Sequence, residues 1–163
     1  KGCGEAWAIG ADMATGEYIQ FSADDIVMHP GWWHKAVRYC DQGFLPAARV
    51  LNTDGSLQSC GNNNLEMKEG AVPEFTRSPI VSREQWEKLR PLVHPFLLKA
   101  HYFTDNVFTD AGRTLGMETV VCRSYEYTHH MTQVGASDNQ RNTRMQQDFD
   151  LYREYLSNGF AFA

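Results

Sequence analysis

The sequence predicts an α+β fold in a single domain, with N-terminal helices, a small and mostly antiparallel sheet, and a long C-terminal helix. Three observations support this expectation. The 163 residues suit one domain and are few for two. Helical patterns dominate before residue 50, and β-rich runs gather later in the chain. A turn-rich stretch, 44–78, reads as an irregular bridge between a helical lobe, 1–50, and a sheet-plus-helix lobe, 80–163.

The N-terminal part predicts a helix over 5–14, because Gly4 precedes it and Gly16 follows it. Residues 17–21 alternate polar and apolar side chains, which is typical of a short strand. Ser22 is a good N-cap for a short helix running to about Met28, with two aspartates in its first turn. Apolar residues at helical spacing then predict a helix over 32–41.

The C-terminal part contains a capping box, Ser82 to Gln85, which predicts a helix start. Pro91 and Pro95 are expected to limit that helix. Asp138 is expected to cap a helix running to about Ser157. The strands predicted between these helices are Phe96–Phe103, Thr119–Cys122 and Met131–Val134.

Composition narrows the classes of partner. The net charge is −5, the pI is about 5.6 and no basic run stands out, so we expect no nucleic-acid partner. No apolar stretch approaches the ~18 residues that span a bilayer. The chain begins at Lys1, which suggests that a signal peptide, a propeptide or added sequence has been removed. A secreted or extracytoplasmic location is slightly favoured, and the oligomeric state is left open.

The opening residues, Cys3-Gly4-Glu5-Ala6-Trp7-Ala8, carry the sharpest functional signal. A cysteine at position 6 would lie near a helix N-terminus, where the backbone N–H groups favour a thiolate. The residue there is Ala6. The segment nevertheless resembles the nucleophile motif of papain-like cysteine peptidases, Cys-Gly-Ser-Cys-Trp-Ala-Phe, with Ala6 where the catalytic cysteine belongs.

Later segments extend this resemblance in the expected order. Residues 15–22, followed by Ile26-Val27, are similar to the family's Leu-Ser-x-x-x-Leu-Val stretch. His129-His130, followed by Val134-Gly135, resembles the strand that carries the family's catalytic histidine. The family's Asn-Ser-Trp has no counterpart, and Asn139 is the amide that lies near that place. The oxyanion-hole glutamine of the family is also missing from this chain.

The resemblance implies a thiol-dependent peptide or amide hydrolase with a two-lobe arrangement and a peptide or protein substrate. His129 or His130 would exchange a proton with a thiolate at position 6, and Asn139 would orient the ring. Gly4, Trp7 and Trp32 would contact the substrate. With Ala6 in place the enzyme would be inactive, whether the alanine is natural or introduced. No cofactor is implied.

Other interpretations remain open. Alanine is the best helix former, so position 6 need not lack anything, and the chain would then be a non-catalytic binding or structural domain at a cell surface, cell wall or virion. Residues 21–44, followed by residues 78–86, look a little like a surface-layer homology module, although no second copy exists.

The cysteines and several acidic residues can also be explained by structural roles alone. The four cysteines, Cys3, Cys40, Cys60 and Cys122, form two disulfides or stay free thiols. No CxxC, HExxH or phosphate-loop spacing occurs, so we expect no metal site. Asp54, Asp105 and Asp110 are interpreted as turn residues.

Overall fold

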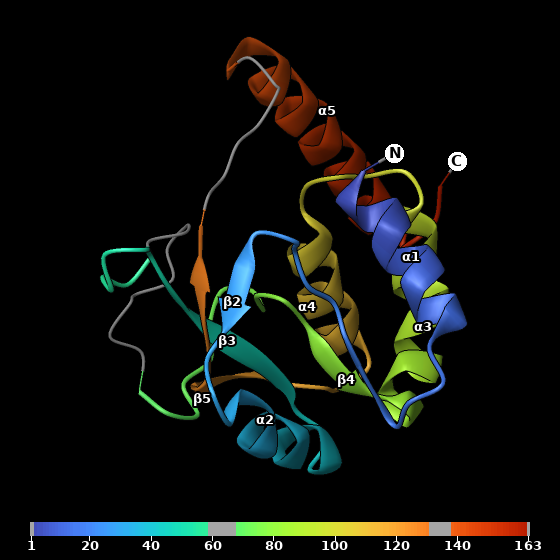
Figure 1. Ribbon diagram of the computed structural model, residues 1–163. Helices are drawn as coiled ribbons and strands as arrows, with labels where there is room; N and C mark the ends of the chain where they lie inside the picture. The colour runs from blue at the N-terminus through green and yellow to red at the C-terminus, as the bar shows by residue number, and fades with distance from the viewer. Residues whose placement is uncertain (1, 59–67, 131–137, 163) are drawn as a thin grey trace.

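The computed structural model describes residues 2–58, 68–130 and 138–162. It confirms an α+β architecture. In Figure 1, α1 lies along α3 on one side of the molecule, α4 lies in the middle, and α2 covers strands on the other side. The elements of the described part are, in chain order, α1 (Cys3–Met13), β1 (Tyr18–Gln20), β2 (Ile26–Met28), α2 (Trp32–Asp41), β3 (Leu45–Leu51), β4 (Ile80–Ser82), α3 (Arg83–Leu97), α4 (Thr104–Thr114), β5 (Thr119–His129) and α5 (Asp138–Ser157).

The strands form two small sheets. β1 and β4 pair antiparallel, with Ile19 opposite Val81. β5 is the central strand of the other sheet, antiparallel to β2 and parallel to β3. Ile26 of β2 lies opposite His129, the last residue of β5. The sheet therefore brings the loop before β2 against the end of β5.

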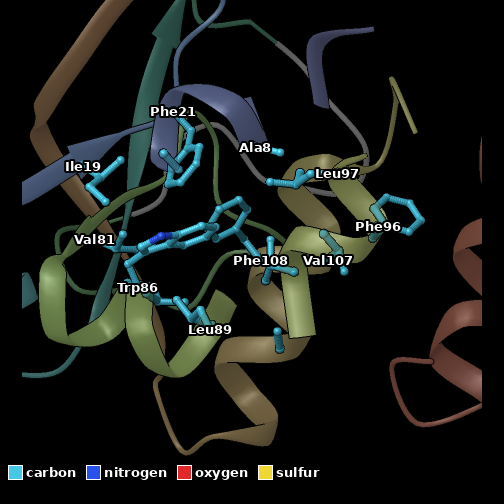
Figure 2. Close-up of a cluster of buried hydrophobic side chains, with 14 of the residues drawn as sticks. Ala8, Ile19, Phe21, Val81, Trp86, Leu89, Phe96, Leu97, Val107 and Phe108 are labelled. Carbon is cyan, nitrogen blue, oxygen red and sulfur yellow. The ribbon is translucent and has the colours of Figure 1, made fainter. Parts of the chain in front are cut away.

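Two hydrophobic clusters hold these layers together, and each combines residues from before position 50 with residues from position 80 onward. The first is built around three rings, with centroids 5.2 Å apart for Phe21 and Trp86 and 4.6 Å apart for Phe21 and Phe108 (Figure 2). The second lies under α2. Its buried members are Ala36, Cys40, Ala48, Val50, Ile80, Cys122, Tyr125 and Tyr127.

Four predicted helices are confirmed, because strong local signals mark each of them. α1, α2 and α5 occupy the predicted ranges to within two residues. At the start of α3, the Ser82 hydroxyl accepts from the Gln85 N–H, and the Gln85 side chain accepts from the Ser82 N–H. Both halves of the predicted capping box are thus present.

The helix predicted from Ser22 to Met28 is wrong, because these residues enter a strand instead. The Ser22 hydroxyl donates to the Ala23 carbonyl and does not cap a helix. Ile26–Met28 form β2, and Met28 lies opposite Tyr127 of β5. Backbone pairing with a distant strand has overridden the local cap signal.

The irregular bridge expected over 44–78 also contains a strand. β3, Leu45–Leu51, is mostly buried and pairs parallel with β5. Its residues do not alternate between polar and apolar, because parallel strands are covered on both faces. The period-2 pattern that identifies a half-exposed strand is therefore absent from this segment.

The strand predicted over 96–103 is wrong as well. Phe96 and Leu97 end α3, and α4 begins at Thr104. Pro91 and Pro95 lie inside α3 and do not limit it. The proline cost of about 3 kcal/mol is offset here because the helix buries large side chains on both sides of them.

The strand predicted over Thr119–Cys122 is confirmed and continues to His129. Met131–Val134 lie outside the described residues. Within the described part, no helix combines the length and apolar content that crossing a bilayer requires.

Candidate functional site

The candidate site begins where the β2–β5 pairing brings an aspartate against a histidine. Asp25 directly precedes β2, and its carboxylate Oδ2 lies 3.2 Å from Nε2 of His129. The His130 backbone N–H also donates to the Asp25 carbonyl, at 2.8 Å. Both side chains keep about a quarter of their surface exposed. The pair is therefore fixed by the strand backbone and still accessible to a ligand.

The other ring nitrogen of His129 faces a second polar side chain. Nδ1 lies 3.3 Å from the Gln58 side-chain oxygen, and the Gln58 backbone is anchored by its N–H to Val50. Both ring nitrogens thus face oxygen acceptors, whereas a neutral imidazole carries one N–H. A bound cation between Nε2 and Asp25 would satisfy the second contact.

A buried carboxyl forms the other half of the site. Asp105 lies in the first turn of α4, and its Oδ1 is buried without a hydrogen-bond partner in the described structure. Burial raises the pKa of this carboxyl to about 7, while the charge of Arg77 and the Ser78 backbone N–H oppose the rise. A carboxyl with a pKa near neutrality can both take up and release a proton at physiological pH, which is the property of a general base.

Carboxylates from both halves of the site act electrostatically on Cys3. Burial and the charges of Asp105, Asp24 and Asp25 raise the pKa of its thiol to about 11. Its backbone N–H donates to Nδ1 of His101 at 2.8 Å, which fixes the start of α1 there. The start of α1 therefore faces carboxylates from both halves of the site. Because the thiol stays protonated at neutral pH, Cys3 is not an activated nucleophile.

The residues singled out from the opening motif have mostly structural contacts. Ala6 is exposed on α1. Gly4 is buried where α1 crosses α3, and a Cβ there would lie 2.4 Å from the Ala100 carbonyl oxygen. Trp7 packs against Phe21, and its indole N–H donates to the Ser22 carbonyl at 3.0 Å.

Of the other predicted site residues, one lies in the candidate site. Trp32 stacks on Tyr125, with centroids 5.2 Å apart. His129 lies in the candidate site, where its partners are Asp25 and Gln58. His130 is exposed. Asn139 belongs to α5, and its side chain lies outside the described residues. The pairing of either histidine with a thiolate at position 6 stays a prediction.

Sequence reasoning missed most of the site. Asp25 was assigned to a helix N-terminus and Asp105 to a turn, and Gln58 and Arg77 carried no signal of their own. The paired aspartates 24 and 25, between an alternating segment and the apolar Ile26-Val27, are the feature that could have indicated an acidic site at a strand end.

Cysteines and cavities add two observations. Cys3, Cys40 and Cys122 are free thiols, and Cys60 lies outside the described residues. A cavity of about 450 Å³ lies along α2 and is lined by His34, Lys35, Arg38, Tyr39 and Gln42. It does not coincide with the aspartate–histidine site.

No protein-family model matches the chain, and no curated protein matches it. Among solved structures, the chain is similar to S. aureus TarS, a glycosyltransferase, with a TM-score of 0.53 and 11% sequence identity. The match covers 96% of this chain and 31% of TarS. This chain thus spans less than a third of TarS, and the likeness concerns the fold.

Proposed function

We propose that this chain carries catalytic residues of a glycosyltransferase, which moves a sugar from a phosphate-activated donor to an acceptor hydroxyl. The observation that carries the proposal is the arrangement around Cys3. Asp105, whose carboxyl pKa is about 7, and Asp25, which is paired with His129, both act electrostatically on the Cys3 thiol and raise its pKa. A base and a phosphate-binding pair are the two parts that such a transfer requires.

The proposed role of the Asp25–His129 pair is to hold a cation that binds the leaving phosphate of the donor. A carboxylate and an imidazole 3.2 Å apart fit a divalent cation such as Mn²⁺, and diphosphate oxygens and water would complete its coordination. Such a cation would neutralise the negative charge that develops on the leaving phosphate. Among the described residues, no group of three acidic, histidine or cysteine side chains encloses a metal, so the chain alone would bind it weakly. This proposal departs from the expectation that no metal or cofactor is needed.

Asp105 is the proposed base that deprotonates the acceptor hydroxyl. As the acceptor oxygen bonds to the sugar carbon, its proton passes to the Asp105 carboxylate, and the phosphate leaves with the electron pair of the broken C–O bond. Because the pKa is about 7, the carboxyl can take up this proton and release it to solvent after each turnover. The fold similarity to part of TarS, a glycosyltransferase, is what suggests this reaction class.

A transfer assay tests the proposal. The chain is incubated with Mn²⁺, a panel of nucleotide-activated sugars and a mixed set of sugar acceptors, and the released nucleotide diphosphate is measured. We expect D105N and H129A to lower release at least 100-fold, because each removes a reacting or charge-neutralising group. D150N, in the exposed part of α5, is the matched control and should retain full activity. Release that is equal in all four proteins would refute the proposal.

The thiol hydrolase predicted from the opening motif remains a second proposal. The observation in its favour is that His129 is held by a carboxylate, Asp25, as the base of a catalytic triad would be. Restoring the nucleophile with A6C, followed by a thiol-directed peptide inhibitor, tests it. Labelling no greater than that of the unmodified chain would exclude it and leave the non-catalytic binding domain as the alternative to sugar transfer.

A further inference from the structure

Arg77 is a buried cation beside the candidate base. Its residue surface is 8% exposed, and it precedes the turn that leads into β4. Its Nη1 donates to the Gln58 backbone carbonyl at 3.3 Å. The ion pairs formed among the described residues do not include it. Within the described residues, the hydrogen-bond partner of the Arg77 guanidinium is therefore a neutral group, the Gln58 carbonyl.

The backbone holds Arg77 in this position firmly. The next residue, Ser78, adopts a left-handed conformation with φ +47°, which is uncommon for a residue other than glycine. Its carbonyl accepts from the Tyr125 hydroxyl, and its own hydroxyl donates to the Tyr127 oxygen at 3.1 Å. Such a conformation persists where the surroundings over-determine it, and it is found most often at functional sites.

The positive charge of Arg77 acts on Asp105. It is the stronger of the two effects that oppose the burial-induced rise in the carboxyl pKa, and the Ser78 backbone N–H supplies the other. Arg77 is also connected, through Gln58, to His129 at the other half of the site. The guanidinium therefore acts on the proposed base, Asp105, and is connected through Gln58 to the Asp25–His129 pair.

We infer that Arg77 binds a negatively charged group of the acceptor, a carboxylate or a phosphate, next to the hydroxyl that Asp105 deprotonates. This inference rests on the proposed function. Arg77 forms no ion pair within the described residues, and a buried guanidinium without one is costly. An anion that forms two N–H···O bonds with the guanidinium offsets that cost. Arginine presents a planar fork that matches both carboxylate and phosphate geometry. The acceptor is thus an acidic or phosphorylated sugar or polyol.

Ligand binding distinguishes this role from a purely structural one. D-Glucuronate and D-glucose 6-phosphate are titrated against D-glucose into the wild-type chain, R77Q, R77K and the exposed control R153Q, with saturation-transfer NMR as the readout. We expect the wild type to bind at least one of the two acidic sugars at least tenfold more tightly than glucose. R77Q should lose this preference, R77K should keep part of it, and R153Q should behave as the wild type.

The two acidic probes separate the sources of the anion. A preference for glucuronate alone indicates a carboxylate acceptor, and a preference for glucose 6-phosphate alone indicates a phosphorylated one. No preference in the wild type, or an equal preference in R77Q, would overturn the inference. If R77Q does not fold, the salt dependence of binding to the wild type tests the inference instead. The acidic sugar should bind at least fivefold more weakly in 500 mM than in 50 mM NaCl, whereas the affinity for glucose should not change. An equal response of both sugars to salt would also overturn it.

A separate measurement identifies a failure of the proposed function itself. Mn²⁺ with inorganic diphosphate is titrated into the wild type and H129A, with the electron paramagnetic resonance of Mn²⁺ as the readout. Weaker binding to H129A supports the donor half of the site. If the metal does not bind but the acidic sugars still require Arg77, the sugar-transfer proposal fails at its donor half and the anion site on Arg77 stands.

Discussion

The carboxylate of Asp25 lies 3.2 Å from the ring of His129, although 104 residues separate the two in the chain. Strand pairing produces this contact, because Ile26 and His129 are direct partners between β2 and β5. A fixed backbone holds both groups before any ligand binds, which lowers the cost of organising the site. The same geometry explains why neither residue is conspicuous alone.

Replacing Asp105 should make the protein more stable at high pH. The carboxyl pKa is raised to about 7 in the folded state, above the ordinary value of 3.8, so the folded protein holds a proton that the unfolded chain releases. Stability from this group is therefore present below pH 4 and is lost as the pH rises to 7. We expect D105N to exceed the wild type by about 4 kcal/mol at pH 8 and to differ little at pH 4. Urea unfolding at both pH values measures this, and a constant difference would contradict the assigned pKa.

The α1–α3 contact depends on a glycine. A Cβ at position 4 would lie 2.4 Å from the Ala100 carbonyl oxygen and 2.5 Å from that of Leu97, and backbone atoms cannot yield easily. We expect G4A to destabilise the protein by about 2 kcal/mol or more. Gly10 of the same helix is the matched control, since a Cβ there meets no atom within 4 Å. G10A should stabilise by about 0.5–1 kcal/mol, because alanine loses less entropy than glycine in a helix. Equal urea midpoints for the two variants would contradict this packing.

α5 is anchored by a buried carboxylate. Asp148 is 3% exposed, and its Oδ2 accepts from the backbone N–H groups of His101 and Tyr102 at 2.8 and 2.9 Å. Removing it leaves two donors without their partner, so D148A should cost about 2–4 kcal/mol. D150A, two residues along the helix, should change stability by less than about 0.5 kcal/mol. Hydrogen exchange at the His101 and Tyr102 amides would show faster exchange in D148A alone, and unchanged exchange there would refute the anchor.

The described thiols should react slowly. Burial raises the pKa of Cys3 to about 11 and that of Cys40 to about 12, and it also raises the pKa of Cys122. At pH 8 only about a thousandth of Cys3 would be thiolate, so iodoacetamide should modify it at least 100-fold more slowly than in urea. Peptide mapping by mass spectrometry assigns each site. Rapid labelling of Cys3 in the folded protein would contradict its environment and favour a thiol-based function.

Several helices were predictable from the sequence because their signals are local. The Ser82–Gln85 box and the apolar spacing of 32–41 act within a few residues of the element that they begin. α4 was missed because Phe103, at its N-cap, has φ +63° and provides no side-chain cap. Without a cap signal, the aromatic residues before α4 were interpreted as a strand.

The sequence by itself determined the fold class and these helices, and it predicted His129 as a site residue. Tertiary structure alone decided that 22–28 would not be a helix and that β3 would form. It also brought Asp25 and Gln58 to His129 at the end of β5, and buried Asp105 where its charge acts on Cys3. The physical reason is the range of the forces involved. Caps and helical periodicity act over one or two turns, whereas strand pairing, desolvation and long-range charge act only after distant segments meet.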